Sequence, residues 1–345
     1  MSRSHPSVAV VGASGAVGTE LIACLERRNF PLRQLRLFAS SRSAGRALPY
    51  RGHSLLLEAL TEQALADTEI ALFCAGSAIS HRFVPPAVQR GTVVIDNSSA
   101  FRMHGAVPLV VPEVNAELIG AHRGIIANPN CVAIITVVAL WPLHRAFGIR
   151  RIVASTYQAA SGAGAAAMEE LRQSTRAALA GETVRPKVLR HPYAFNLYSH
   201  DTAVDPATGA NEEETKVARE LRKIMHAPDL RVGVTCIRVP VLRAHAVALN
   251  VEFECPITPE AARELLAQAP GVRVVDDTAA NHFPMPIEAT GQADVLVGRI
   301  RSDSSDASGH SLALFVAGDQ LLKGAALNAV QVAERLLAPD RRSDA

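Results

Sequence analysis

The chain has 345 residues, and its 35 basic and 33 acidic side chains give a formal net charge of +2 at pH 7. This near balance argues against a nucleic-acid-binding protein that relies on phosphate contacts, and it excludes a disordered acidic or basic chain. At roughly 100–200 residues per domain, the length predicts two domains. Hydrophobic residues make up 48% of the chain and aromatic residues only 4%, so we expect aliphatic cores.

The first 130 residues alternate short apolar runs with helical stretches. Buried strands are expected at Ser7–Val11, Leu35–Ala39, Ile70–Ala75, Val93–Asp96 and Gly124–Ala127. Helices are expected between them, among others at Gly18–Arg28 and Ser80–Arg90. Strands that alternate with helices predict βαβ units and a parallel sheet, the α/β class.

The pattern changes from about residue 130. A long helix is expected from Cys131, a strand at Arg151–Gln158, a Gly/Ala-rich loop and helix from Ser161, and a helix near Glu212. Further strands are expected at Arg231–Val239, Ala246–Glu254, Val272–Asp276, Val295–Ile300 and Ser311–Ala317. Runs of strands with few helices predict an α+β domain with an antiparallel or mixed sheet. Leu321–Leu337 is expected to form a closing helix, and Ala338–Ala345 a frayed tail.

A glycine-rich turn, GASGAVG at residues 12–18, follows the first predicted strand directly and precedes a helix. Glycines in this place permit a tight turn and a close approach of the backbone to a pyrophosphate at the helix N-terminus. The spacing is a variant of the dinucleotide fingerprint, and its position between strand and helix is the context that supports it. The alternative is a plain strand–helix turn.

The end of the second predicted strand indicates which dinucleotide is bound. NAD enzymes usually carry Asp or Glu about 20 residues after the glycines, where the acid binds the ribose 2′-hydroxyl. Here the strand runs into SSRSAG at residues 40–45, with no acid. Hydroxyls and Arg42 suit a 2′-phosphate, so the segment favours NADP over a solvated polar turn without a ligand.

Cys131 stands at the start of the long helix that opens the second domain. It follows Pro129, which cannot continue a preceding element, and Asn130, which is a good N-cap. Unpaired N–H groups and the positive end of the helix dipole favour a thiolate there, and the same N–H groups are candidates for an oxyanion hole. The alternative is a cysteine that serves only as a small residue.

A nucleotide-binding domain and an activated cysteine together indicate hydride exchange through a covalent thioester. That chemistry needs a base and an anion site. Arg102 follows a strand end, where α/β sheets place ligands, and it is a candidate for holding phosphate. Arg238 and His245 lie at a later strand end and beyond it. The alternatives are a surface arginine and a structural histidine.

Other kinds of site are not indicated. The five cysteines are odd in number and form no C-x-x-C pair, and the twelve histidines form no H-E-x-x-H pair, so we expect neither a disulfide framework nor a metal site. The longest apolar stretch, Cys131–Leu143, is too short to span a bilayer. With no signal-peptide core at the N-terminus, a cytoplasmic location and no membrane partner are expected.

Taken in chain order, the motifs resemble those of aspartate-semialdehyde dehydrogenases. The resemblance is carried by Gly12–Gly18, Ser41–Gly45, Asn97–Arg102, Val111–Asn115, Asn128–Cys131, Tyr157–Gly162, Asn211–Lys216, Thr235–His245 and Gly318–Ala326. It implies a Rossmann-type NADP-binding domain formed by residues 1–130 with the C-terminal helix at about 321–345. Residues 131–320 would form an α+β catalytic and dimerisation domain with a mixed sheet. A homodimer or a dimer of dimers is implied.

The resemblance also implies roles for single residues. Cys131 would be the nucleophile that carries the acyl group as a thioester, and His245 the acid/base. Gln158 would orient the substrate, Arg238 would bind its α-carboxylate, and Glu213 would bind its amino group.

Phosphate and cofactor contacts are implied in the same way. Arg102 and Lys216 would hold the phosphate. The implied cofactor-binding residues are Gly12, Ser14, Gly15, Ala16, Val17, Arg42, Ser43, Ser161, Gly162 and Gln320. An arginine offers a planar fork for a carboxylate and a lysine a point charge, which suits these assignments. For Glu213 and Lys216 the alternative is a helix start capped by Asn211.

Two departures from the family pattern accompany the resemblance. Cys131 is followed by Val132-Ala133 where the family usually has hydroxyl residues, and His245 is followed by the apolar run Ala246–Leu249 where the family has a polar stretch. The first change removes hydroxyls beside the nucleophile. Neither change removes a residue with an implied chemical role.

The implied reaction is reversible, NADPH-dependent reduction of L-4-aspartyl phosphate to L-aspartate 4-semialdehyde with release of phosphate. It belongs to the synthesis of lysine, threonine, methionine and diaminopimelate. One alternative is an N-acetyl-glutamyl-phosphate reductase, against which the expected contact of Glu213 with a free amino group argues. The other is a non-catalytic relative that acts as a binding protein, favoured only by Val132-Ala133.

Overall fold

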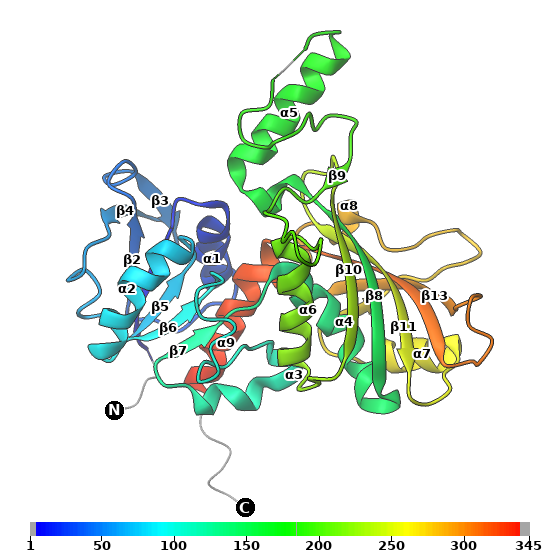
Figure 1. Cartoon of the computed structure of the whole chain (residues 1–345). Helices are drawn as coiled ribbons and strands as arrows, with labels where there is room; N and C mark the ends of the chain where they lie inside the picture. Colours follow the sequence, from blue (N-terminus) through cyan, green and yellow to red (C-terminus); the bar gives the residue numbers. More distant parts are fainter. Residues whose placement is uncertain (1–4, 184, 339–345) are drawn as a thin grey trace, which may run out of the picture. The chain divides into compact units, whose positions relative to one another are not determined.

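The computed structural model describes residues 5–183 and 185–338, so that most of the predicted tail lies outside the described residues. Its contacts divide the chain into two compact units (Figure 1). The first runs to Pro129 and resumes at Ala325, and the second comprises Asn130–Gly324. The boundaries predicted from the sequence were residue 130 and about residue 321.

The first unit is built on a seven-stranded sheet in the order β3-β4-β2-β1-β5-β6-β7. The strands are β1 Ser7–Val11, β2 Gln34–Ala39, β3 Ala47–Tyr50, β4 His53–Ala59, β5 Ile70–Phe73, β6 Val93–Asp96 and β7 Ile125–Ala127. All neighbours pair in parallel except β3 with β4. The central strands β1, β5 and β6 are buried throughout, as expected for the middle of a parallel sheet.

The helices of the first unit are α1 Ala16–Arg27, α2 Ser77–Gln89, α3 Pro112–Asn115, the 3₁₀ segment Ala116–Ala121 and α9 Leu327–Leu337. Helix α9 comes from the far end of the chain and packs against α1, where Arg28 pairs with Glu334 at 2.7 Å. The sequence analysis predicted one helix over Leu321–Leu337, but the structure has a π-helical turn at Leu322–Ala326 before α9 begins. The hairpin β3–β4 was not predicted; its strands are mostly exposed.

The second unit has a mixed seven-stranded sheet in the order β12-β13-β14-β11-β8-β10-β9. Its strands are β8 Ile149–Gln158, β9 Tyr198–Ser199, β10 Arg231–Arg238, β11 His245–Phe253, β12 Val272–Val274, β13 Val295–Ser302 and β14 Ser311–Gly318. The pairs β8/β10 and β12/β13 are parallel, and the other neighbours are antiparallel. The predicted α+β domain with a mixed sheet is therefore present.

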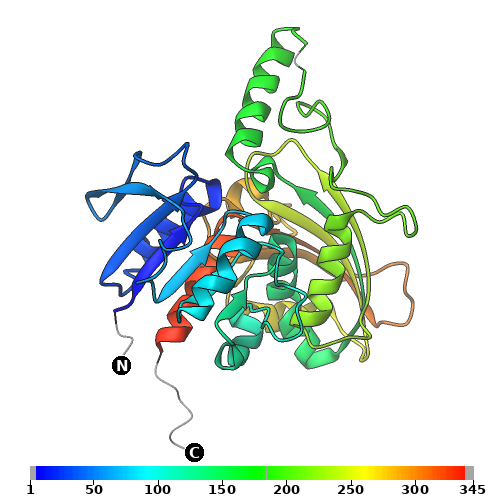
Figure 2. The same cartoon turned by 60° about the vertical axis from the view of Figure 1, so that its left-hand side comes forward.

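The helices of the second unit are α4 Cys131–Phe147, α5 Ala165–Leu179, α6 Glu212–Ile224, α7 Pro259–Ala267 and α8 Pro286–Ala289. Helix α4 contacts strands β8, β11, β13 and β14 as well as helices α6 and α7, which explains why its residues from Val132 to Leu140 are all buried. Helix α5 stands out from the rest of this unit in both views (Figures 1 and 2). In the described parts of the chain, no helix has both the length and the apolar character needed to cross a membrane.

Candidate active site

Strand register brings three of the predicted site residues to one edge of the second sheet. Gln158 and Arg238 end the parallel strands β8 and β10, where they are register partners. Strand β11 runs antiparallel to β8 and begins at His245, so it starts at the same edge. The sheet thus assembles residues that lie up to 87 positions apart in the chain.

The N-terminus of α4 is tied to this edge by Asn130. The Asn130 side-chain oxygen accepts hydrogen bonds from the main-chain N–H groups of Val132 at 2.9 Å and Ala133 at 3.3 Å, which confirms the predicted N-cap. Its side-chain nitrogen donates to Glu213 at 2.8 Å, and its main-chain N–H donates to Glu220 at 2.6 Å. Cys131 therefore follows a residue held by four hydrogen bonds. The amides of Val132 and Ala133 donate to the cap, and an oxyanion hole at this helix start stays a prediction.

Glu213 is a buried carboxylate at the start of α6. Its Oε1 accepts from the amides of Asn130 at 2.8 Å and Gln158 at 3.1 Å. Burial opposes ionisation, but the neighbouring His200 and the two amide donors hold the pKa of Glu213 below its ordinary value. The negative charge that is needed to bind an ammonium group is thus maintained inside the protein. The predicted cap of α6 by Asn211 is also present, with reciprocal bonds to Glu214.

Arg238 is 4% exposed and is held on two sides. One of its terminal nitrogens donates to the Ala159 carbonyl at 3.3 Å, and its Nε lies 3.5 Å from a carboxylate oxygen of Asp201. The sequence analysis did not single out Asp201, because no motif marks it and only the fold brings it to β10. A guanidinium fixed in this way presents a rigid fork, which suits bidentate binding of a carboxylate.

His245 is fully buried at the start of β11. Its Nδ1 accepts a hydrogen bond from the main-chain N–H of Ala159 at 3.0 Å. Burial and, next, the charges of Arg238 and His200 lower the pKa of His245 well below its ordinary value. A Cβ at Gly162 would lie 3.1 Å from Nε2 of His245 and 3.1 Å from a terminal nitrogen of Arg238, so only glycine leaves this place open.

Gln320 supports the backbone next to His245, and its predicted contact with the cofactor stays a prediction. Its side-chain oxygen accepts from the main-chain N–H of Ala244 at 2.9 Å, and its side-chain nitrogen donates to the Ser161 hydroxyl. Ala244 directly precedes His245 and has a φ of +70°, a conformation that an L-residue seldom adopts without support. Gln320 and Ser161 therefore hold the backbone that carries His245.

The two residues predicted to hold phosphate lie in different units. Lys216 on α6 pairs with Glu212 at 3.2 Å, and its side chain is 32% exposed. Arg102 belongs to the first unit, where it is buried and donates to the main-chain carbonyls of Asn128 at 2.9 Å and Asn97 at 2.7 Å. Their joint role in phosphate binding stays a prediction.

The first unit carries a turn that fits a dinucleotide. Gly12 has a φ of +93°, and a Cβ there would lie 2.9 Å from the backbone of Cys74. A Cβ at Gly18 would lie 2.2 Å from the Gly12 carbonyl, so helix and turn pack too closely for any side chain. Gly15 occupies the N-cap position of α1 but has no side chain that could accept from the first N–H groups of the helix. Ser14 and Gly15 are exposed. An uncapped helix N-terminus beside exposed backbone is what a pyrophosphate needs.

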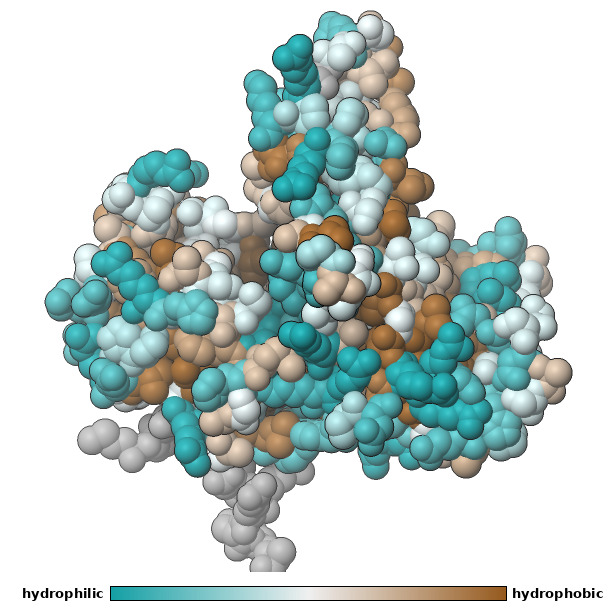
Figure 3. Space-filling view, in the orientation of Figure 1, coloured by the Kyte–Doolittle hydropathy of each residue, from teal (hydrophilic) through white to brown (hydrophobic). Residues whose placement is uncertain are grey.

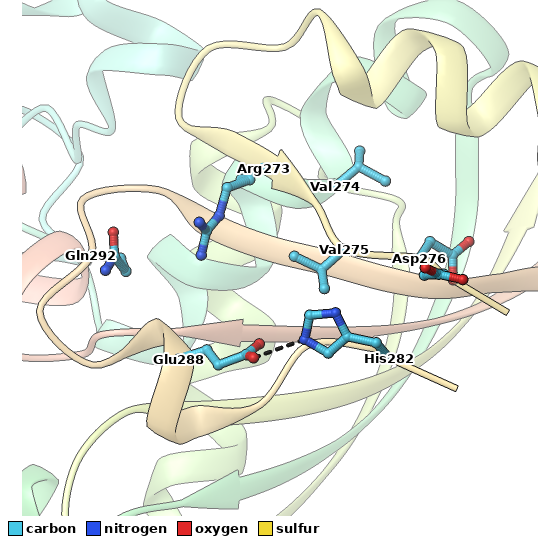
Figure 4. A pocket seen from close by; sticks show the side chains of 8 residues that line it. Arg273, Val274, Val275, Asp276, His282, Glu288 and Gln292 are labelled. Atoms are coloured by element: carbon cyan, nitrogen blue, oxygen red, sulfur yellow. Dashed lines mark hydrogen bonds and ion pairs between the residues drawn. The ribbon is translucent and has the colours of Figure 1, made fainter. Parts of the chain in front are cut away.

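A cavity of about 590 Å³ lies elsewhere in the second unit, beside β12 (Figure 4). Its lining includes Arg273, Asp276, His282 and Glu288, and the last two are joined by a 2.8 Å contact. None of the predicted site residues lines it.

Comparison with known proteins gives the family. Residues 7–122 match the NAD binding domain of semialdehyde dehydrogenases, and residues 140–323 match their dimerisation domain. The aspartate-semialdehyde dehydrogenase of Synechocystis sp. is 51% identical over 96% of this chain and 97% of its own length. That of Bacillus subtilis is 44% identical over 95% and 96%. The chain belongs to the aspartate-semialdehyde dehydrogenase family.

Solved structures agree with the family. The structure of aspartate-semialdehyde dehydrogenase II from Vibrio cholerae, complexed with ASA, is 40% identical, has a TM-score of 0.93, and is matched over 96% of this chain and 98% of that one. The Candida albicans enzyme with NADP is 22% identical with a TM-score of 0.76, and it shows the shared fold alone. The predicted family, the two-part α/β fold and an oxidoreductase with an NAD-binding domain are thereby confirmed.

Within this family, sequence reasoning missed several residues of the site. Ala159, Asp201 and Glu220 contact His245, Arg238 and the start of α4, but none of them has a role predicted from the sequence. A main-chain group such as that of Ala159 leaves no signal in a single sequence. The buried acid Glu220 follows Glu213 by seven positions on α6, and this helical period was the one available hint.

Proposed function

We propose that the chain catalyses reversible, NADPH-dependent reduction of L-4-aspartyl phosphate to L-aspartate 4-semialdehyde, with release of phosphate. The observation that supports this best is the cluster around Asn130, which joins the helix start at Cys131 to Glu213 and Gln158 at the edge that also carries Arg238 and His245. The family gives the reaction class. The cluster offers a positive charge for the α-carboxylate of an amino acid and a negative charge for its α-ammonium group.

Each residue of the cluster has a part in binding or bond formation. The Arg238 fork binds the α-carboxylate, and ionised Glu213 binds the α-ammonium group. The Cys131 sulfur attacks the acyl carbon, a C–S bond forms, and the bond to the phosphate oxygen breaks with its electron pair leaving on phosphate. His245 is the acid/base and protonates the departing thiolate or the hemithioacetal oxygen. Arg102 and Lys216 stabilise the departing phosphate.

The cofactor would be held by the turn at residues 12–18, with Arg42 and Ser43 after β2. When bound, NADPH supplies the hydride that reduces the acyl group. Arg42 is exposed beside Ser43 and offers a positive charge for a 2′-phosphate.

The partner in assembly is a second copy of the chain, bound through the face of the second sheet opposite α4. Tyr157, Ile237 and Ala246 lie on this face, because they are register partners on β8, β10 and β11. Tyr157 is 37% exposed and stacks on Phe315 of β14 with ring centres 6.0 Å apart. Figure 3 shows apolar surface over this part of the second unit. In the proposed homodimer this face is covered by the second copy.

The predicted cytoplasmic location also stays part of the proposal.

The decisive assay is NADPH formation from L-aspartate 4-semialdehyde and NADP, with and without inorganic phosphate. Phosphate-dependent formation is expected. Its absence in folded protein that binds NADPH would contradict the proposal, and activity with N-acetyl-glutamate semialdehyde instead would support the sibling reductase.

Cys131→Ala is expected to abolish turnover, because no other group in the site can form the thioester. NADPH binding, measured by fluorescence titration, should remain. Turnover at the wild-type rate would remove Cys131 from the mechanism.

A further inference from the structure

The rate of a reaction at Cys131 depends on where its sulfur is placed. A nucleophile must meet the acyl carbon in a suitable line of attack, and a displacement of about 1 Å costs on the order of 10²-fold in rate. Cys131 begins α4 and directly follows Asn130, so the main chain at Asn130 sets where the cysteine side chain starts. The groups that hold this main chain therefore influence the chemistry without touching the substrate.

Asn130 is held by α4 and by α6. Its side-chain oxygen caps α4, and its main-chain carbonyl accepts the first bond of that helix from the Ile134 N–H at 2.9 Å. Its side-chain nitrogen donates to Glu213 on α6, and its main-chain N–H donates to Glu220 on the same helix at 2.6 Å. Asn130 is buried, so water is not at hand to replace the acceptor at this N–H.

Glu220 is an unusual residue for the place it occupies on α6. The buried face of this helix consists of Glu213, Val217, Glu220, Leu221 and Ile224. Glu220 is only 1% exposed, and a carboxylate buried beside apolar side chains costs free energy unless it is hydrogen-bonded. An apolar side chain of similar size would suit the packing of the helix better. The bond to the Asn130 N–H gives a reason for an acid here.

We propose that Glu220 is a positioning residue for Cys131, which fixes the start of α4 through the main-chain N–H of Asn130. This inference rests on the proposed function. Glu220 and Glu213 are seven positions apart and lie on the same face of α6, so one helix holds both the main chain and the side chain of Asn130. Cys131, including its own main-chain N–H, is placed together with Asn130.

The position of Glu220, and not its charge, is what helps catalysis. A negative charge near a thiol opposes its ionisation, so a second carboxylate beside Asn130 does not favour a thiolate. Turnover requires the sulfur at one point relative to a bound substrate, whereas a small reagent in solution can approach it from any open side. Loss of Glu220 should therefore slow turnover much more than it slows alkylation of Cys131.

Amide NMR tests the bond without any measurement of activity. Asn130 is the one asparagine of the sequence that follows a proline, so ¹³C at proline carbonyls and ¹⁵N in asparagine select its amide signal. A short bond to a carboxylate predicts a downfield proton shift and slow exchange with deuterium. Both should be lost in Glu220→Leu. An Asn130 signal that is the same in the wild type and Glu220→Leu would overturn the inference.

Steady-state kinetics separate placement of the sulfur from substrate binding. Arg238 and Glu213 keep their own contacts, so KM for L-aspartate 4-semialdehyde should stay within about threefold of the wild type. We expect kcat to fall about tenfold in Glu220→Gln, which retains an acceptor, and about 10²-fold in Glu220→Leu, which does not. Iodoacetamide should label Cys131 within about threefold of the wild-type rate in both variants.

Two control variants separate this role from stability and from charge. Glu170→Gln removes a buried carboxylate that also binds main-chain N–H groups, but on α5. Lys223→Met removes a positive charge that interacts with Glu220 on α6. Both should keep kcat, per folded molecule, within about threefold of the wild type.

Several results would contradict the positioning role. One is a loss of kcat in either control as large as that in Glu220→Leu, and another is a raised KM with unchanged kcat. Wild-type kinetics of Glu220→Leu would also do so. If Glu220→Leu does not fold, the tenfold loss expected in Glu220→Gln takes its place, and wild-type kcat there contradicts the role.

The proposed function and this inference fail in different ways. If the wild type shows no phosphate-dependent activity, the proposed function fails, while the NMR comparison still reports whether Glu220 holds Asn130. If the wild type is active and Glu220→Leu keeps its kcat, only the inference on Glu220 fails.

Discussion

At the scale of single residues, the site is made by groups that each serve two partners. Asn130 caps α4 with its oxygen and binds Glu213 with its nitrogen. Ala159 donates to His245 with its N–H and accepts from Arg238 with its carbonyl. Because one residue is hydrogen-bonded to two others, a small displacement of that residue moves both partners. Local substitutions should therefore affect kcat or KM more than overall stability.

Thiol reactivity should distinguish Cys131 from Cys74 and Cys236. Burial raises the pKa of Cys74 and of Cys236 to about 12, so at pH 8 only on the order of 10⁻⁴ of each is thiolate. Iodoacetamide at pH 8 should label Cys131, as located by peptide mass spectrometry, and leave Cys74 and Cys236 unlabelled until denaturant is added. Rapid labelling of either in the native protein would be evidence against this account.

Gly324→Ala tests how tightly Cys131 is held. A Cβ at Gly324 would lie 3.0 Å from the Cys131 Cβ and 3.3 Å from its Cα, and the hydrogen bonds of Asn130 prevent α4 from yielding freely. We expect kcat/KM to fall about tenfold or more through displacement of the sulfur. Gly105→Ala is the matched control, because that site has no atom within 4 Å of a Cβ. Equal, wild-type kinetics of both variants would show that the close approach is unimportant.

At the scale of elements, strand register decides which residues meet. The parallel pair β8/β10 and the antiparallel strand β11 place Gln158, Arg238 and His245 at one edge.

Helix α5 is joined to the chain that follows it by the buried carboxylate of Glu170. This carboxylate accepts hydrogen bonds from three consecutive main-chain N–H groups, those of Lys187 at 2.5 Å, Val188 at 2.7 Å and Leu189 at 3.0 Å. This carboxylate fixes the segment that returns from α5.

Glu170→Gln should destabilise this part of the second unit in a pH-dependent way. Burial raises the pKa of Glu170, but the three N–H donors outweigh it and the net pKa lies below the ordinary value. Its stabilisation is thus present above the unfolded pKa of about 4.3 and is lost as pH falls through the folded pKa.

At pH 7 we expect urea denaturation to show a loss of about 1–3 kcal/mol in the free energy of unfolding of Glu170→Gln. The difference from the wild type should shrink as the pH approaches the folded pKa. Glu169→Gln, at the exposed neighbouring position, should change stability by less than about 0.5 kcal/mol. A loss that stays constant with pH would mean that the carboxylate charge is not what binds the segment.

At the scale of the whole molecule, the chain divides into a unit with a nearly all-parallel sheet and one with a mixed sheet. The first carries the glycine turn, and the second carries Cys131, His245 and the residues expected to bind the amino acid. The mixed sheet lies in the part of the chain, residues 140–323, that matches the family's dimerisation domain.

Tyr157→Glu is expected to weaken the dimer. The change places a charge near the end of β8 on this sheet face, and burying an unpaired charge in an interface costs several kcal/mol, which weakens the dimer by about 10²-fold or more. Sedimentation equilibrium should then find monomer at micromolar concentration. Leu56→Glu, at a side chain 64% exposed on β4 of the first unit, should stay dimeric. An undisturbed dimer of Tyr157→Glu would place the interface elsewhere.

Local patterns were sufficient for the parts of the fold that depend on short stretches of chain. Apolar runs located β1 and β6 to the residue, and the Asn-Pro-Asn-Cys segment located the start of α4. The hairpin β3–β4 was missed although β4 carries three consecutive leucines at 55–57, because its strands are mostly exposed and do not follow the pattern of buried strands. Helix α7 was missed although Thr258 and Pro259 are ordinary start signals.

The sequence by itself determined the order of the main elements, the capped cysteine and the family. Each of these depends on neighbouring residues or on the order of motifs along the chain. Only the tertiary structure decided that Asn130 binds Glu213, that Gln320 supports Ala244 and that the Ala159 N–H donates to His245. These contacts join residues up to 86 positions apart, and two of them run through main-chain N–H groups that every residue except proline carries. A hydrogen bond from such a group depends on where the backbone is placed and not on which side chain it bears.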